Sequence, residues 1–282
     1  DLKREDTLFY FTTCGWMMWN WMVSALAVGA TLVLYDGSPT YPKMTSCWEL
    51  IDKTGITVFG TSAKFIASCQ EKDIYPNQSL LLKTLRAILS TGSPLIEENY
   101  DYIYEHVKSD VQVSSISGGT DIVSCFSLGT PMEPVYRGYL QCRGLGMAVD
   151  AVNEAGESVV NEAGELVCRK AAPCMPIYFW NDEDGKRYKA SYFETYPGLW
   201  HHGDYIYLHE SGHLKVLGRS DATLNPGGVR IGTSEIYRVV EALEEVADSL
   251  VIGKQSGGDE TIMLYIQLAE GAVLDKALKS KI

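Results

Sequence analysis

Val111-Gln-Val-Ser-Ser-Ile-Ser-Gly-Gly-Thr-Asp121 joins an apolar run to two glycines, a hydroxyl and a carboxylate. The run 111–117 predicts a buried strand. Glycine lets a backbone approach a ligand closely, a hydroxyl can contact a phosphate oxygen, and a carboxylate is a ligand for hard cations. The stretch therefore predicts a metal-bridged phosphate site at Thr120 and Asp121, although Gly-Gly-Thr-Asp also suits an ordinary exposed turn.

Helical and strand patterns alternate before this stretch, which is typical of an α/β fold whose parallel sheet carries helices on both faces. Three predicted strands end in polar turns that contain glycine, at 60–62, 90–93 and 117–121. Because ligands bind beyond the carboxyl ends of parallel strands, these turns mark a candidate site. The predicted strands span 31–36, 56–59, 85–89 and 111–117, and the predicted helical segments span 44–53, 62–72 and 96–107.

The most hydrophobic run, Trp16–Leu34, is just long enough to cross a membrane. We interpret it instead as a helix that Gly29 stops, followed by a strand that ends at a turn at Gly37. The β-branched composition of the second half favours this interpretation.

Short strands with closely spaced glycines begin at about Pro131, and they predict β-hairpins and a small barrel. The tetrapeptide Asn-Glu-Ala-Gly occurs at 153–156 and again at 161–164, and each copy is interpreted as a hairpin turn. A helix at 234–243 and strands at 249–253 and 261–268 then predict a small α+β domain. The predicted regions are 1–130 (α/β sheet), 131–220 (β-rich) and 221–282 (start of the small domain).

The composition excludes several classes of function. A formal net charge of −12 at pH 7 repels nucleic acid and anionic membrane surfaces. Seven scattered cysteines without a C-x-x-C pair favour reduced thiols in a cytoplasmic protein, and Cys142, Cys168 and Cys174 are interpreted as core residues. The first residues resemble the interior of a longer chain, so we expect a fragment.

A second candidate site lies in Trp200-His-His-Gly-Asp204 and Gly218-Arg219. A carboxylate that accepts from two ribose hydroxyls beside a guanidinium is common in nucleotide sites, and two hairpins would bring Asp204 and Arg219 together. The alternative is a surface ion pair. His201 and His202 are interpreted as packing residues, because no partners stand at metal-ligand spacing.

Six motifs in order resemble those of the acyl-adenylate-forming superfamily of acyl-CoA synthetases, adenylation domains and luciferases: GWMMW, STGSP, SGGTD, GELV, WHHGD and GRSDATLNPGGVRIGTSEIY. The resemblance covers essentially the whole chain and is closest to the branch that activates acetoacetate. It implies a ligase that joins an acid to ATP, releasing pyrophosphate, and then passes the acyl group from acyl-AMP to coenzyme A, with Mg²⁺. Such an enzyme feeds ketone-body carbon into lipid metabolism.

The resemblance also implies a role for each matching position. Asp121 stands where most of the family has Glu, and Gly227-Gly228 also suits a tight turn after Pro226. The implied roles are adenine contact for Gly92, Ser93 and Pro94; phosphate contact for Gly119, Thr120 and Arg230; magnesium binding for Asp121; ribose contact for Asp204 and Arg219; coenzyme A contact for Ser62 and Gly228; the domain hinge for Asp221; and the acyl pocket for Met17, Met18, Trp19 and Thr91.

The acyl-pocket assignment has a competing interpretation, because Met17–Trp19 also suits the core face of an apolar helix. For acetoacetate we expect a short, mostly apolar pocket with a donor for the ketone, which Thr91 would supply. The family's phosphate loop and C-terminal catalytic lysine have no match here, so we expect this chain alone to be inactive. The alternatives are another short-chain acyl-CoA synthetase or a non-catalytic nucleotide-binding module.

Overall fold

The computed structural model describes residues 2–220, 223–224, 231–256 and 259–282. A five-stranded sheet with the order β2-β1-β3-β4-β5 forms the N-terminal region, and all its neighbouring strands are parallel. The predicted α/β class with a parallel sheet is confirmed. The strands are β1 (Thr7–Tyr10), β2 (Thr31–Val33), β3 (Val58–Ser62), β4 (Ala87–Thr91) and β5 (Gln112–Ser115).

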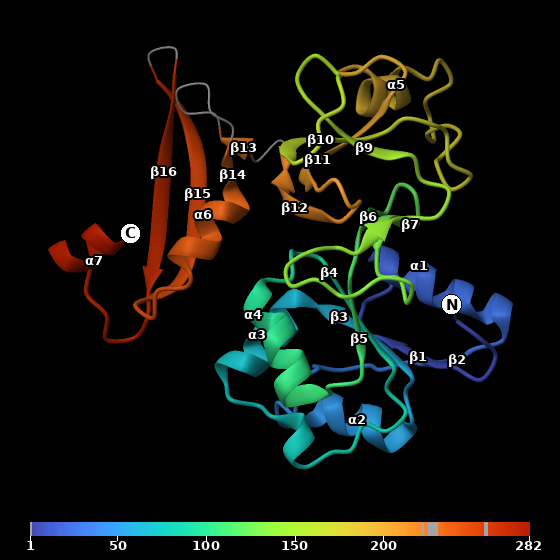
Figure 1. Cartoon of the computed structure of the whole chain (residues 1–282), viewed down its shortest axis with the longest axis vertical. Helices are drawn as coiled ribbons and strands as arrows, with labels where there is room; N and C mark the ends of the chain where they lie inside the picture. Colours follow the sequence, from blue (N-terminus) through green and yellow to red (C-terminus); the bar gives the residue numbers. More distant parts are fainter. Residues whose placement is uncertain (1, 221–222, 225–230, 257–258) are drawn as a thin grey trace.

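Helices cover both faces of this sheet (Figure 1). On one face, Phe9 and Phe59 stack with ring centroids 5.6 Å apart, and Trp48 meets Phe59 edge-on at 5.5 Å. On the other face, Leu8 packs in a cluster with Met22 of the first helix. Because successive strand residues point to opposite faces, both must be apolar here. The helical segments are α1 (Met17–Ser24), η1 (Ala25–Val28), α2 (Ser46–Thr54), α3 (Ala63–Glu71), η2 (Pro76–Gln78), α4 (Glu97–Tyr102) and η3 (Ile103–Val107).

The hydrophobic run Trp16–Leu34 forms helix, turn and strand, as predicted. The helical part ends at Gly29, whose φ of 77° lies in the left-handed region that glycine adopts without steric cost. Among the described residues, no helix combines the length and apolar character needed to cross a membrane.

Two antiparallel sheets follow, with the orders β6-β7-β8 and β12-β11-β10-β9, and a bridge between Leu140 and Leu214 joins segments next to them. They share a core that contains Phe126, Trp200 and Ile206. A helix that the sequence did not predict, α5 (Lys186–Phe193), packs on this core (Figure 1). The strands are β6 (Ser117–Gly119), β7 (Ser124–Leu128), β8 (Cys142–Arg143), β9 (Val149–Val152), β10 (Glu162–Cys168), β11 (Trp200–Leu208) and β12 (Leu214–Arg219).

The two Asn-Glu-Ala-Gly copies adopt different structures. Residues 153–156 form the expected turn, in which the Gly156 amide donates to the Asn153 carbonyl. Residues 162–164 instead begin strand β10, where Glu162 is the register partner of Leu208. The prediction of a second hairpin turn at 161–164 is therefore wrong.

The C-terminal region contains the predicted helix and the two predicted strands. Figure 1 shows the long β15–β16 hairpin and the last helix standing apart from the sheets described above. The elements are β13 (Thr223–Leu224), β14 (Ile231–Gly232), α6 (Thr233–Val240), β15 (Val246–Ser256), β16 (Asp259–Leu268) and α7 (Lys276–Lys281).

Candidate nucleotide and acyl site

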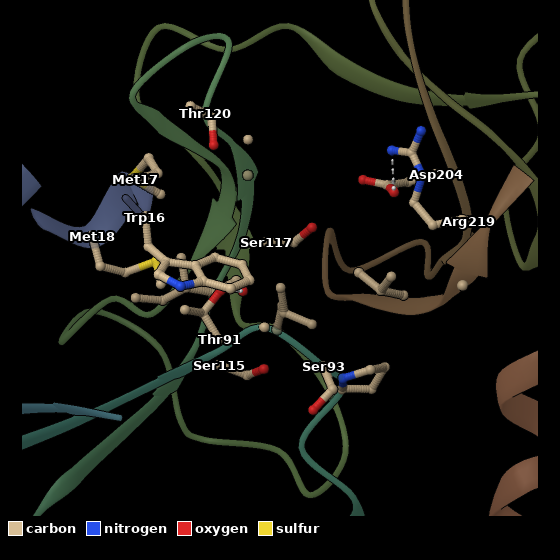
Figure 2. A pocket seen from close by; sticks show the side chains of 18 residues that line it. Trp16, Met17, Met18, Thr91, Ser93, Ser115, Ser117, Thr120, Asp204 and Arg219 are labelled. Carbon is tan, nitrogen blue, oxygen red and sulfur yellow. Dashed lines mark hydrogen bonds and ion pairs between the residues drawn. The ribbon is translucent and has the colours of Figure 1, made fainter. Parts of the chain in front are cut away.

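A cavity of about 310 Å³ lies beyond the carboxyl ends of β4 and β5, where the sequence predicts the site. Its walls come from the start of α1, the segment after β4, the segment from β5 to the end of β6, and strands β11 and β12 (Figure 2). Segments far apart in the chain therefore meet here. The predicted site residues that line it are Met17, Met18, Thr91, Gly92, Ser93, Pro94, Gly119, Thr120, Asp204 and Arg219.

The two glycines of the quoted stretch lie in strand β6, which pairs with β7, and not in a turn. A Cβ atom added to Gly118 would lie 2.1 Å from the Ser124 carbonyl oxygen, and one on Gly119 would lie 2.6 Å from His202 Cε1. Both distances are far below van der Waals contact. We expected these glycines to admit a ligand, but they are required for close packing within the protein while they also border the cavity.

Asp121, the predicted magnesium ligand, lies beside the cavity and is exposed. Its Oδ1 accepts a hydrogen bond from the Tyr192 hydroxyl. Its Oδ2 lies 3.1 Å from the position that a Cβ on Gly119 would occupy. The two carboxylate oxygens therefore have different surroundings, Oδ1 against α5 and Oδ2 on the side of Gly119 that faces the His202 ring, and Asp121 itself is not among the residues that line the cavity.

No cluster of three or more His, Cys, Asp or Glu side chains is placed to hold a metal ion in the part of the chain that the structure describes. Mg²⁺ in nucleotide sites needs only one or two carboxylates, because substrate phosphates and waters complete its ligands. Asp121 fits such a site. The seven cysteines are free thiols, and Cys168 is buried in the core, as predicted for a packing residue.

Asp204 and Arg219 are register partners on β11 and β12. Arg219 Nη1 lies 3.2 Å from Asp204 Oδ1 and also donates to the His202 carbonyl oxygen at 3.2 Å. The Asp204 side chain is 11% exposed and that of Arg219 is 54% exposed. The pair thus presents a fixed carboxylate and a partly solvated guanidinium to one cavity (Figure 2).

The two histidines beside Asp204 pack within the protein. His201 Nε2 lies 3.0 Å from Glu165 Oε2. The His202 ring contacts Phe126, with centroids 4.5 Å apart, and burial lowers the pKa of its imidazole. These contacts agree with the interpretation of both as packing residues.

The predicted acyl-pocket residues divide into two groups. Met18 and Trp19 both pack against the buried cluster that contains Leu8 and Tyr10, but Met17 and Met18 line the cavity and Trp19 does not. Each helix residue turns the side-chain direction by about 100°, so three consecutive residues do not share one face. The assignment of Trp19 to the pocket wall is corrected accordingly.

Thr91 lines the cavity, but its hydroxyl donates to the Ile116 carbonyl oxygen at 3.0 Å. A hydroxyl has one proton to donate, so Thr91 in this geometry does not serve as a donor for a substrate ketone. The donor role that we expected for Thr91 is corrected by this contact.

Ser62 lies at the end of β3 as the register partner of Thr91, on the same sheet edge but outside the cavity lining. Its hydroxyl accepts from the Phe65 amide at 3.2 Å and caps α3. Arg230, Asp221 and Gly228 lie outside the described residues, so their roles stay predictions.

Several lining residues were not predicted. Trp16 stands next to the predicted Met17, and Ser115 and Ser117 alternate at the end of a predicted strand, which was a usable signal. Leu140 and Val216 carry no such signal, because distant strands bring them to the cavity. Ile116 was not predicted either, whereas Gly118 and Gly218 belong to the two stretches that the sequence singled out.

The parallel sheet, the cavity at its carboxyl edge and the facing Asp204–Arg219 pair are typical of α/β proteins that bind a ligand beyond the carboxyl ends of their strands. The family model of the AMP-binding enzymes matches residues 1–179, and the chain belongs to that family. Individual relatives make the similarity more specific.

The chain is 50% identical to the acetoacetyl-CoA synthetase of Gallus gallus and 51% identical to that of Mus musculus, each over 100% of this chain. It is 52% identical to the acetoacetyl-coenzyme A synthetase of Rhizobium meliloti, again over its whole length. The matched parts are 43%, 42% and 43% of those proteins, so the chain spans less than half the length of these relatives.

Two solved structures agree with the fold. Acetoacetyl-CoA synthetase from Streptomyces lividans superposes with a TM-score of 0.93 at 43% identity, covering 100% of this chain and 43% of that one. An anthranilate CoA ligase, solved in complex with anthranoyl-AMP, superposes with a TM-score of 0.79 at 19% identity and is similar in fold alone.

Proposed function

We propose that the chain is part of an ATP-dependent acid–CoA ligase that activates acetoacetate. The observation that carries the proposal is identity of about half of all positions, over the whole chain, with acetoacetyl-CoA synthetases. In the proposed reaction the acid's carboxylate attacks the α-phosphate of ATP, giving acyl-AMP and pyrophosphate. The thiol of coenzyme A then attacks the acyl carbon, and AMP leaves.

The nucleotide is proposed to lie across the sheet edge. Gly92, Ser93 and Pro94 would lie along the adenine, because they form an open, turning segment beside the cavity. Asp204 would accept hydrogen bonds from the two ribose hydroxyls. Arg219 holds that carboxylate in place, so that its orientation is set before the nucleotide arrives.

The phosphates are proposed to lie at the end of β6. Thr120 is exposed at the cavity wall and offers its hydroxyl to a phosphate oxygen, with Gly119 beside it and Arg230 as a further contact. Asp121 would hold Mg²⁺, which neutralises phosphate charge when bound. Asp121 directly follows Thr120, which lines the cavity, and this position suits the role.

The acid is proposed to bind between the start of α1 and β4. Met17 and Met18 supply apolar surface there, which suits a short acid. Ser62 and Gly228 are proposed to meet coenzyme A. A hinge at Asp221 would separate residues 1–130 and 131–220 from the small domain at 221–282. The scattered cysteines favour a cytoplasmic location.

The test is acid-dependent exchange of pyrophosphate into ATP by a full-length protein that carries this chain, measured with a panel of short acids. We expect exchange with acetoacetate and much less with acetate or butyrate. Exchange with a different acid would identify a sister synthetase. ATP binding without exchange would identify a nucleotide-binding module. The isolated chain is expected to show no exchange.

A further inference from the structure

A tyrosine from outside all the predicted motifs reaches the carboxylate of the quoted stretch. The hydroxyl of Tyr192, on α5, donates to Asp121 Oδ1 across 71 positions of sequence. Tyr192 is buried, with 6% of its surface exposed, whereas Asp121 is exposed to solvent. A buried, fixed donor therefore holds one oxygen of a side chain that would otherwise rotate freely in water.

The tyrosine ring is itself fixed by packing. It stacks on Trp200 with centroids 3.6 Å apart and an interplanar angle of 14°, and Phe179 meets it edge-on at 5.7 Å. The Asp182 carboxylate accepts from the Arg187 and Tyr188 amides at 3.0 and 2.9 Å, which anchors the start of α5. The position of the hydroxyl is thus set before any ligand binds.

The hydrogen bond leaves Asp121 with one oxygen committed and one available. Oδ2 lies on the side of Gly119 that faces the His202 ring. The Tyr192 phenol is the donor of this hydrogen bond, because an ionised carboxylate only accepts. An oriented carboxylate avoids the entropy cost of being ordered when a ligand binds.

We propose that Tyr192 is a positioning residue that fixes the orientation of the Asp121 carboxylate before a phosphate-bound cation binds. The inference rests on the proposed function, in which Asp121 is the residue that holds Mg²⁺. Tyr192 acts only through Asp121 and touches neither the substrate nor the reacting atoms.

The test is Tyr192→Phe in a full-length protein that carries this chain, because Phe keeps the ring on Trp200 and removes only the hydroxyl. Tyr188→Phe is the matched control, since Tyr188 lies one turn earlier and its ring also contacts that of Trp200, with centroids 6.4 Å apart.

Mn²⁺ binding is measured by electron paramagnetic resonance with a non-hydrolysable ATP analogue. The loss of a hydrogen bond to a charged group typically costs a factor of about ten or more, so we expect Tyr192→Phe to weaken Mn²⁺ binding about tenfold or more. Tyr188→Phe should bind Mn²⁺ as the wild type does.

The same substitution in an Asp121→Ala protein shows whether Tyr192 acts through Asp121, because two residues that act as a unit are not additive. We expect no further loss of Mn²⁺ binding in that background. Equal binding by Tyr192→Phe and wild type would overturn the proposal, as would an additional loss in the Asp121→Ala background. A melting temperature lowered by more than about 5 °C would also overturn it, since the hydroxyl would then be a structural group. If the wild type binds no Mn²⁺ with the analogue, the proposed function itself fails.

Discussion

Asp204 and Arg219 face each other across β11 and β12, with 3.2 Å between Oδ1 and Nη1, at the wall of the cavity. The carboxylate is buried and the guanidinium is half exposed, so the two residues respond differently to substitution. Loss of Asp204 leaves Arg219 solvated and costs little stability, because ion pairs with an exposed member contribute about 0–1 kcal/mol.

Asp204→Ala in the full-length protein should therefore weaken ATP binding without unfolding it. If Asp204 accepts from the ribose, its loss removes contacts made in both the ground and transition states, which raises the Kd for ATP about tenfold or more. Calorimetric titration measures this, with the exposed Asp110→Ala as control. A fall in turnover at unchanged ATP affinity would contradict the ribose assignment.

Two glycines at the cavity should tolerate alanine very differently. Gly118→Ala places a Cβ 2.1 Å from a backbone oxygen, so we expect a loss above about 3 kcal/mol in the free energy of unfolding. Gly92 has a φ of 92° but no atom within 4 Å of the added Cβ, so Gly92→Ala should cost only about 1 kcal/mol of backbone strain. Urea unfolding of both variants tests the difference, and equal losses would contradict the close packing at Gly118.

The acid preference should change at Met18 and not at Trp19. Met18→Ala enlarges the cavity, so we expect longer acids to gain relative to acetoacetate by about tenfold, the effect of one or two methylenes. Trp19→Ala leaves the lining intact and should instead lower the free energy of unfolding by about 1–3 kcal/mol. Ratios of kcat/KM across a panel of acids measure this preference. A larger change in acid preference with Trp19→Ala than with Met18→Ala would restore the original pocket assignment.

Asp6 should make the stability of the sheet depend on pH. Its carboxylate accepts from Arg86 Nη2 at 2.7 Å and from Thr57 Oγ1 at 2.7 Å, and the Arg86 bond is the main cause that lowers the pKa of Asp6 from 3.8 to about 2. A lowered folded-state pKa stabilises the fold above pH 3.8, and the contribution is lost as pH falls toward 2.

Asp6→Asn should accordingly destabilise the protein by about 1–2 kcal/mol at pH 7, since one buried partner of an ion pair loses its charge. The difference from wild type should shrink between pH 4 and pH 2, as followed by urea unfolding. The exposed Asp36→Asn serves as control. A difference that stayed constant down to pH 2 would show that the effect is steric and not electrostatic.

The sequence predicted the parallel sheet well because the signal is local. The apolar run 56–59, which overlaps β3, and the amphipathic segment 44–53, which overlaps α2, carry their periodicity within a few residues. Strand β1 was missed because Thr7–Tyr10 is only four residues long, and its central place depends on pairing with β2 and β3. Helix α5 is similarly short, and its packing on Trp200 is tertiary.

The candidate site also has features that the sequence predicted and features that depend on tertiary packing. Five of the six motifs contribute residues to the cavity, and the polar turns predicted the edge of the sheet where the cavity lies. Two features depend on how side chains pack. Met18 lines the cavity and Trp19 does not, and the Thr91 hydroxyl donates to the Ile116 carbonyl oxygen. Side-chain direction on α1 is set by the neighbours it buries, which residue order alone does not specify.

The two Asn-Glu-Ala-Gly copies show why a short sequence does not determine its own structure. In the first copy, the Asn153 side chain accepts from the amides of Ala155 and Glu157, so the tetrapeptide closes its own turn, as the sequence determines by itself. In the second, the same atom of Asn161 accepts from the Glu210 amide, 49 residues away. Composition specifies which hydrogen bonds a segment is able to make. Only the tertiary structure decides which partner is near, and it is the tertiary structure that brings Tyr192 to Asp121.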